Sequence, residues 1–168
     1  MSTADLGPSW EDDESDAAWR AANDAADRLE AAWGRVCSPQ GSVEFLRFVP
    51  KPNEPHRLAI VEELVKTDLE QRWRRGQPFR VEYYLMRVPE LGHDPAQLAR
   101  VLVEEYRVRH DYGDRPGIGD YCERFPALAA TLEPMLRAIP VSNQVRPARA
   151  VQGPPAETLP GVRPSESE

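Results

Sequence analysis

Apolar residues recur every three or four positions in several stretches of this chain, the spacing of one face of an α-helix. The pattern predicts longer helices at about 16–33, 55–75, 95–111 and 127–139, and short helices at about 79–87 and 118–124. The residues expected to face the core are Trp19, Ala22, Ala26, Leu29 and Trp33 in the first long helix, Leu58, Val61, Leu64, Val65, Leu69 and Trp73 in the second, Leu98, Val101, Leu102 and Tyr106 in the third, and Leu128, Leu132, Met135, Leu136 and Ile139 in the last. The chain is therefore expected to be all-α.

Two helix starts carry recognisable signals. Asn53 is expected to be the N-cap of the second long helix, with Pro55 in the first turn, where proline has no backbone donor to lose. Asp94 is expected to be the N-cap of the third long helix. Pro95 follows at the first helical position, and Gln97 is expected to reach back as in a capping box.

Glycine and proline mark the helix ends. Gly76 follows the second long helix, where a left-handed residue would end it without a side-chain clash. Gly113 ends the third in the same way, and Pro89 ends the first short helix, because the residue before proline avoids helical geometry. Pro134 is expected to kink the last helix or to delay its start.

The segment from Glu63 to Leu91 is written again 37 residues later, from Val101 to Leu128. The matched pairs are Arg72 with Arg109, Gly76 with Gly113, Tyr84 with Tyr121, Arg87 with Arg124, Pro89 with Pro126 and Leu91 with Leu128. A third, degenerate copy precedes them, since Leu29 and Trp33 align with Leu69 and Trp73. A fixed period of this kind is typical of repeated supersecondary units. We therefore expect a small helical repeat array whose unit is a long helix, a glycine stop, a short helix and a proline turn.

The charge is uneven along the 168 residues, and so is the composition. Net charge is −7, and residues 1–30 hold nine acids and two arginines, 2 − 9 = −7, so the remainder is neutral. We expect a disordered acidic N-terminus at 1–15, a helical repeat domain at 16–139 and a Pro-rich disordered linker at 140–168. An acidic chain makes a poor general nucleic-acid binder, because phosphate contact needs a basic surface.

Several classes of protein are disfavoured by what the sequence lacks. No apolar run reaches the length of a membrane span, and no basic-then-apolar signal peptide opens the chain. Cys37 and Cys122 are too few for a disulfide framework, and we expect reduced thiols in a cytoplasmic protein. His56, His93 and His110 have no partner at the spacing of a known metal motif. We expect no metal, no cofactor and no membrane partner.

Asp68 with Arg72, and Glu105 with Arg109, are acid-then-base pairs at i, i+4. One interpretation is a paired binding surface. The favoured interpretation is pairing on exposed helix faces, worth roughly 0.3–0.5 kcal/mol for each pair.

The motif Tyr84-x-x-Arg87-x-Pro89 recurs as Tyr121-x-x-Arg124-x-Pro126. The tyrosine is expected to anchor the short helix on the long one with its hydroxyl at the rim. The arginine is expected to cap carbonyls where the short helix ends. This interpretation, architecture, is favoured over a ligand site.

Arg72, Arg74, Arg75 and Arg80 surround Trp73 and form the candidate interaction surface. An aromatic residue among arginines suits single-stranded nucleic acid. A solvated helix end with favourable dipole contacts is the favoured alternative.

The runs ELVKTDLEQRWRRGQPFRVEYYLMRVPEL and EEYRVRHDYGDRPGIGDYCERFPAL resemble a segment found ahead of the catalytic domain in large multidomain bacterial serine/threonine protein kinases. The upstream ADRLEAAWGR also looks like that segment, so the resemblance covers about residues 20–139. In that family a Pro-rich linker follows, as 140–168 does here. The chain has no Gly-rich loop, no His-Arg-Asp and no Asp-Phe-Gly, so no catalytic residue is carried over.

The resemblance implies a non-catalytic protein-interaction or regulatory module linked to serine/threonine kinase signalling, with a kinase domain or another signalling protein as its partner. We expect no enzyme activity. Two alternatives stay open. The chain could be the truncated N-terminal part of a kinase, or a nucleic-acid-associated regulator that uses the arginines around Trp73.

Overall fold

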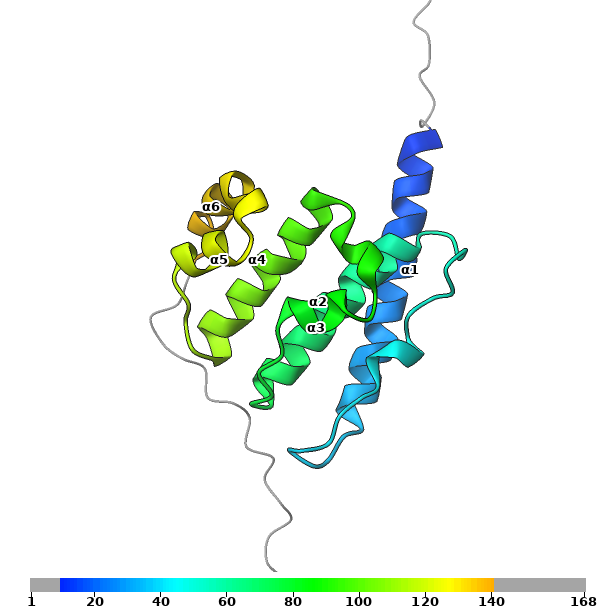
Figure 1. The fold of residues 1–168 in the computed structure, drawn as a ribbon. Helices are drawn as coiled ribbons and strands as arrows, with labels where there is room; N and C mark the ends of the chain where they lie inside the picture. Colours follow the sequence, from blue (N-terminus) through cyan, green and yellow to red (C-terminus); the bar gives the residue numbers. More distant parts are fainter. Residues whose placement is uncertain (1–9, 141–168) are drawn as a thin grey trace, which may run out of the picture.

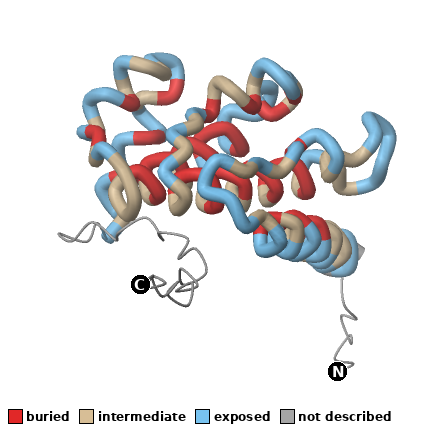
Figure 2. Tube along the Cα trace, turned by 90° about the horizontal axis from the view of Figure 1, so that it is seen from below, coloured by how far each residue is buried: buried red, intermediate tan, exposed pale blue. Residues whose placement is uncertain are grey.

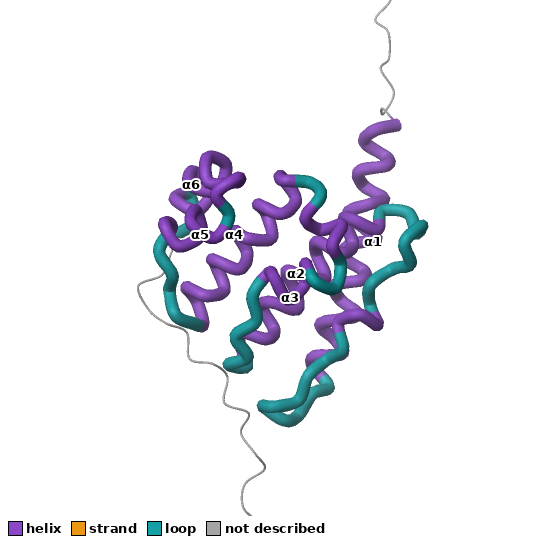
Figure 3. Tube along the Cα trace, in the orientation of Figure 1, coloured by secondary structure: helices purple, strands orange, loops and turns teal. Residues whose placement is uncertain are grey.

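The computed structural model describes residues 10–140, and every regular element in that range is helical (Figures 1 and 3). The all-α prediction is thus confirmed. In chain order the elements are α1 (Trp10–Gly34), the 3-10 helix η1 (Phe45–Arg47), α2 (Arg57–Arg74), α3 (Val81–Leu85), the 3-10 helix η2 (Pro89–Gly92), α4 (Pro95–Tyr112), α5 (Ile118–Arg124), the 3-10 helix η3 (Pro126–Leu128) and α6 (Ala129–Arg137).

The longer helices lie next to one another in chain order. α1 packs on α2, α2 on α4, and α4 on α6, while the short α3 and α5 lie over the array with the 3-10 turns that follow them (Figure 1). Buried positions line the inner helix faces, and α1 exposes the side that points away from the array (Figure 2). One continuous core runs through the described residues, with Trp33, Phe45, Tyr84 and Tyr121 among its largest fully buried side chains.

The two 37-residue segments contain the same order of elements. α2, α3 and η2 make up the first segment, and α4, α5 and η3 make up the second. Salt bridges join the long helices, with Arg100 of α4 on Glu62 of α2 and Arg107 of α4 on Glu70 of α2.

The apolar stripe of α2 is as predicted from Val61 to Trp73, but Leu58 is exposed. In α1 the buried residues are Ala22, Ala25, Leu29 and Trp33, so Ala25 replaces the predicted Ala26. Trp19 is also wrongly predicted, because its side chain is 68% exposed. Contact with α2 begins to bury α1 only from Ala22 onward, and Trp19 lies to one side of that stripe.

The helix starts differ in how well they were predicted. α1 begins at Trp10, so residues 10–15 are helical and not disordered. The rest of the predicted disorder falls on 1–9 and 141–168, which lie outside the described residues. α2 begins at Arg57 behind His56, which has a φ of 58° and makes no side-chain cap. The Asn53 and Pro55 prediction is therefore wrong, because residues 51–57 form successive turns instead.

At the start of α4 the Asp94 prediction is confirmed, since its carboxylate accepts from the Ala96 N–H at 2.9 Å. The capping-box role for Gln97 is wrong. Its side-chain amide donates to the Leu58 carbonyl at 2.7 Å, which ties the start of α4 to the start of α2. Pro134 lies inside α6, which starts at Ala129 after the 3-10 turn.

The two glycine stops serve different purposes. Gly76 has a φ of 72°, the left-handed geometry that was predicted. Gly113 has a φ of −137°, which any residue adopts. A Cβ there would lie 2.8 Å from Cε3 of Trp73 and closer still to Cζ3, so Gly113 is needed for space rather than for conformation.

Candidate functional site

The carboxylate of Asp68, on α2, lies in the core between α1 and α3. Oδ1 accepts from the Trp33 indole N–H at 2.8 Å. Oδ2 accepts from Arg72 Nε at 2.6 Å and from the Tyr84 hydroxyl at 2.7 Å. Asp68 is fully buried and Arg72 is 3% exposed. The predicted surface pairing of Asp68 with Arg72 is therefore wrong, because α1 and α3 cover this face of α2.

Glu105, on α4, occupies the same position in the second segment. Its Oε1 accepts from the Tyr121 hydroxyl at 2.8 Å, from Arg124 Nη1 at 2.7 Å and from Arg109 Nη1 at 3.0 Å. Its Oε2 accepts from the Val81 backbone N–H at 2.7 Å. Burial is the largest influence and would raise the pKa of Glu105, but Arg124, the Val81 amide and the Tyr121 hydroxyl together hold this pKa below its usual value.

Both tyrosines of the repeated motif anchor a short helix on a long one, as expected, but neither hydroxyl lies at the rim. Tyr84 and Tyr121 are fully buried. Burial, together with the neighbouring carboxylate Asp68, raises the pKa of Tyr84 well above its usual value. Tyr84 and Tyr121 therefore serve as neutral hydrogen-bond donors.

The two motif arginines do different things. Arg87 donates to the Tyr83 carbonyl at 2.9 Å, as predicted. Arg124 caps no carbonyl in the structure and instead joins Glu105 to Glu82 of α3. The residue 37 positions before Glu82 is Phe45, which packs edge-on against Tyr84 at 5.1 Å. Arg87 therefore has no carboxylate where Arg124 finds one. Pro89 and Pro126 each open a 3-10 helix, η2 and η3.

The arrangement of these carboxylates is that of a structural core and not of a reaction centre. Each is fully buried and accepts from three or more donors. A buried charge whose lone pairs are satisfied in this way is stable as an ion, because the donors replace the water that it lost. Neither carboxylate is placed to exchange protons with a substrate.

The surface offers a groove between the segment 39–44 and the connection from α2 to α3. We call it the aromatic groove; its lining is Pro39, Gln40, Ser42, Val43, Glu44, Arg72, Arg75, Gly76, Gln77, Pro78, Phe79 and Tyr83. Along one wall the rings of Phe79 and Tyr83 lie 4.5 Å apart. The Arg72 guanidinium covers Phe79 at 4.1 Å, and that of Arg87 covers Tyr83 at 3.6 Å. The wall is thus a continuous row of flat cationic and aromatic groups.

The polar side chains of the groove floor are engaged within the protein. Arg72 donates to the Val43 carbonyl at 3.0 Å, in addition to its bond with Asp68. Gln77 donates to the carbonyls of Pro39 and Gly41, at 3.1 and 3.0 Å. Arg75 donates to the Trp33 carbonyl at 3.0 Å. These bonds hold the two walls together, and the half-buried rings of Phe79 and Tyr83 form the apolar part of the lining.

The residues of the predicted interaction surface do not form one exposed surface in the structure. Arg72 and Trp73 are buried, and the indole N–H of Trp73 donates to the Phe79 carbonyl at 2.8 Å. Arg74 and Arg75 are half-buried, and Arg80 is exposed. Only Arg72 and Arg75 line the groove. Because Trp73 is covered, its ring cannot stack on a base, so the nucleic-acid hypothesis loses the residue on which it rested.

Phe79 and Tyr83 were not singled out from the sequence. Their signal was the spacing of Phe79, Tyr83 and Arg87 at i, i+4 and i+8, which is typical of one helix face, although α3 covers only Val81–Leu85 and so contains only Tyr83 of the three. The 37-residue comparison hides this signal, because Pro116 and Asp120 stand at the matching positions.

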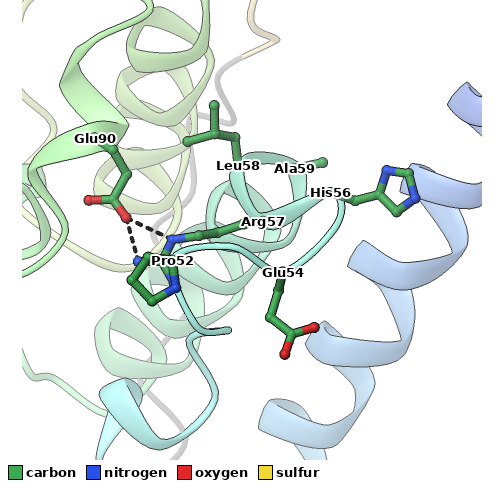
Figure 4. Close-up of a pocket in the computed structure, with 7 residues that line it drawn as sticks. All are labelled: Pro52, Glu54, His56, Arg57, Leu58, Ala59 and Glu90. Atoms are coloured by element: carbon green, nitrogen blue, oxygen red, sulfur yellow. Dashed lines mark hydrogen bonds and ion pairs between the residues drawn. The ribbon is translucent and has the colours of Figure 1, made fainter.

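A second pocket lies at the start of α2, lined by Pro52, Glu54, His56, Arg57, Leu58, Ala59 and Glu90 (Figure 4). The Arg57 and Glu90 side chains form an ion pair across it, and His56 points away from this pair. Burial alone would raise the pKa of Glu90, but its own backbone amide and Arg57 hold it below the usual value. This pocket is a weaker candidate, because its charges neutralise each other.

Within residues 10–140 no three histidine, cysteine or acidic side chains converge as a metal site would require. Over the same part of the chain no helix combines the length and the apolar character needed to cross a membrane. Cys37 and Cys122 are free thiols. Comparison with protein-family models, with curated proteins and with solved structures found no match for this chain.

Proposed function

We propose that this chain is a non-catalytic interaction module of serine/threonine kinase signalling, and that it binds an extended segment of its partner in the aromatic groove. The single observation that carries the proposal is the row formed by Arg72, Phe79, Tyr83 and Arg87 along a groove whose Arg72, Arg75 and Gln77 side chains are bonded within the protein. Flat rings flanked by prolines accept extended, proline-containing peptides, which cost little ordering entropy.

The kinase context comes from the sequence resemblance, which covers about residues 20–139. The buried position of the two repeated acid and base pairs supports a scaffolding role, because Asp68 and Glu105 hold helices together. We place the protein in the cytoplasm, where the exposed thiol of Cys37 stays reduced.

The test uses a matched pair of variants. Phe79→Ala removes a groove ring but keeps the backbone carbonyl that Trp73 needs. Met86→Ala removes a side chain that is 74% exposed and does not line the groove. The purified wild-type chain and both variants are coupled to resin and exposed to an extract of the cell in which the protein naturally occurs. Phosphotransfer from Mg-ATP to a serine/threonine substrate is then measured on the resin.

We expect the wild-type chain and Met86→Ala to retain kinase activity from the extract and Phe79→Ala to lose most of it. Equal retention by Phe79→Ala would remove the groove from the proposal. No activity above that of empty resin for the wild-type chain would overturn the kinase association itself.

A further inference from the structure

Trp19 is a tryptophan whose side chain the fold leaves mostly uncovered. Its side chain is 68% exposed, whereas Trp33 and Trp73 are buried in the core. Scattered exposed apolar side chains are normal, but tryptophan is the residue most enriched where binding energy concentrates. Its position on α1 is also unusual. The part of α1 that packs on α2 is buried from Ala22 onward, and the first turns extend beyond the rest of the array (Figures 1 and 2).

The charge around Trp19 is strongly negative. α1 holds eight acids and two arginines, 2 − 8 = −6. Asp13, Glu14 and Asp16 are exposed, and none of them forms an ion pair with a described residue. Arg20 donates to the Asp16 backbone carbonyl at 3.1 Å and so does not neutralise these carboxylates.

Helical spacing places Asp16, Trp19 and Asn23 on one face. Asp16 lies one turn before Trp19, and Asn23 lies one turn after it, with its amide donating to the Trp19 carbonyl at 2.9 Å. We call the surface made by Asp16, Trp19 and Asn23 the Trp19 face. An apolar ring beside the Asp16 carboxylate, on a helix of net negative charge, is complementary to an apolar stripe bordered by lysine and arginine.

We propose that the Trp19 face docks a basic amphipathic helix of a partner protein, with the indole ring on its apolar stripe and its lysines or arginines against the acids of α1. Charge disfavours the other occupants. A second copy would place one acidic α1 against another. Nucleic acid and anionic lipid are negatively charged and would be repelled by the same surface. Residues 141–168 of this chain hold three arginines and three glutamates, 3 − 3 = 0, and offer no excess positive charge.

The surface is separate from the aromatic groove, so either proposal can fail alone. The probe is a synthetic helical peptide with a leucine stripe and a polar face of lysine and arginine. Two further peptides serve as comparisons: one keeps the leucine stripe with glutamate on the polar face, and the other is polylysine. Binding is measured by calorimetry and by the tryptophan emission of the full chain.

We expect the leucine–lysine peptide to bind, to shift the emission to shorter wavelength, and to weaken as salt rises. Trp19→Ala should reduce its affinity at least about tenfold, as loss of a central aromatic contact does. Asp16→Lys should also weaken it. Met86→Ala, which lies off this face and outside the aromatic groove, should leave it unchanged.

The circular-dichroism melting curve of Trp19→Ala should match that of the wild type, because this side chain is mostly outside the core. Equal binding by wild type and Trp19→Ala would overturn the proposal, and so would equal binding of polylysine or of the glutamate peptide. Absence of binding by all three peptides would overturn it as well. Concentration-dependent dimerisation abolished by Trp19→Ala would assign the face to a second copy and overturn the basic partner.

Discussion

The Tyr121 hydroxyl donates a 2.8 Å hydrogen bond to Glu105, sixteen residues before it in the chain. The same sixteen-residue relation joins Tyr84 to Asp68 at 2.7 Å. Each tyrosine crosses from a short helix to the long helix that precedes it and ends on a buried carboxylate. The two tyrosines therefore make equivalent contacts, which allows their mutants to be compared directly.

Tyr84→Ala and Tyr121→Ala should each destabilise the domain severely and to a similar degree. Removing a fully buried aromatic side chain costs roughly 3–5 kcal/mol, from lost transfer energy and the cavity left behind. Tyr112→Ala should cost nearer 1 kcal/mol, because Tyr112 is only half-buried. Urea melts of the three variants measure these costs. If Tyr112→Ala proved the most damaging, the structural equivalence of Tyr84 and Tyr121 would be refuted.

Asp68→Asn should be more damaging than its small change in volume suggests. It leaves the Arg72 guanidinium, which is 3% exposed, without its anionic partner. An uncompensated buried charge costs roughly 3–5 kcal/mol. Asp27→Asn is the control, because Asp27 is exposed on α1. Chemical denaturation of both variants decides the point, and similar stabilities would show that Arg72 finds another route to solvent or to a partner.

Acid should destabilise the domain partly through Glu105. Burial raises its pKa, but Arg124 and the hydrogen bonds from Val81 and Tyr121 together lower it by more, so the folded-state value lies below the unfolded value of about 4.3. Its contribution is therefore complete above about pH 4.3 and is lost as the pH falls through the lower, folded-state pKa. Glu105→Gln should flatten the dependence of unfolding free energy on pH in that range. The exposed Glu123→Gln should leave it unchanged. Identical pH profiles for the two variants would contradict this assignment.

The matched glycines should respond differently to the same substitutions. At Gly76 the left-handed φ makes alanine cost about 1–2 kcal/mol, and asparagine, which tolerates that region, should cost less. At Gly113 any Cβ displaces the Trp73 ring, so alanine and asparagine should both cost about 1–3 kcal/mol. Thermal melts of the four variants are the measurement. Rescue by asparagine at both positions would mean that Gly113, too, is needed for its backbone conformation.

The chain should bind no nucleotide. Its sequence has no phosphate-cradling glycine loop, and the kinase motifs that hold nucleotide and metal are missing. Differential scanning fluorimetry with and without Mg-ATP should give the same melting temperature. A clear upward shift that persists after removal of residues 141–168 would contradict the non-catalytic proposal.

Apolar periodicity predicted the positions of the helices well, but it did not predict which residues neighbouring helices would bury. Apolar spacing located α2, α4 and the short helices, because these positions face one core. The spacing of Asp68 and Arg72 could not reveal their burial, since the helices that cover them, α1 and α3, come from distant parts of the sequence. Trp19 was wrongly predicted to be buried for a related reason. The apolar stripe of a helix does not reveal how far along that helix the neighbouring helix extends.

The candidate groove was the least predictable part. Arginines around Trp73 were expected to face solvent, but the Val43 and Trp33 carbonyls accept from Arg72 and Arg75. Those acceptors belong to the segment before α2, and nothing local to residues 72–80 indicates them. Phe79 and Tyr83 line the groove as half-buried rings, and the arginines hold the opposite wall in place.

The buried carboxylates also determine how the domain comes apart. Asp68 accepts a hydrogen bond from the Trp33 indole, and Glu105 accepts one from the Val81 amide. Both donors belong to the segment that precedes the acceptor in the chain. No segment can unfold alone without leaving an ion in its neighbour short of a donor. Arrays whose layers meet only through apolar faces can lose their end layers one at a time. In this chain these bonds join α1 to the first segment and the first segment to the second, so heating should yield a single transition in which these three parts melt together.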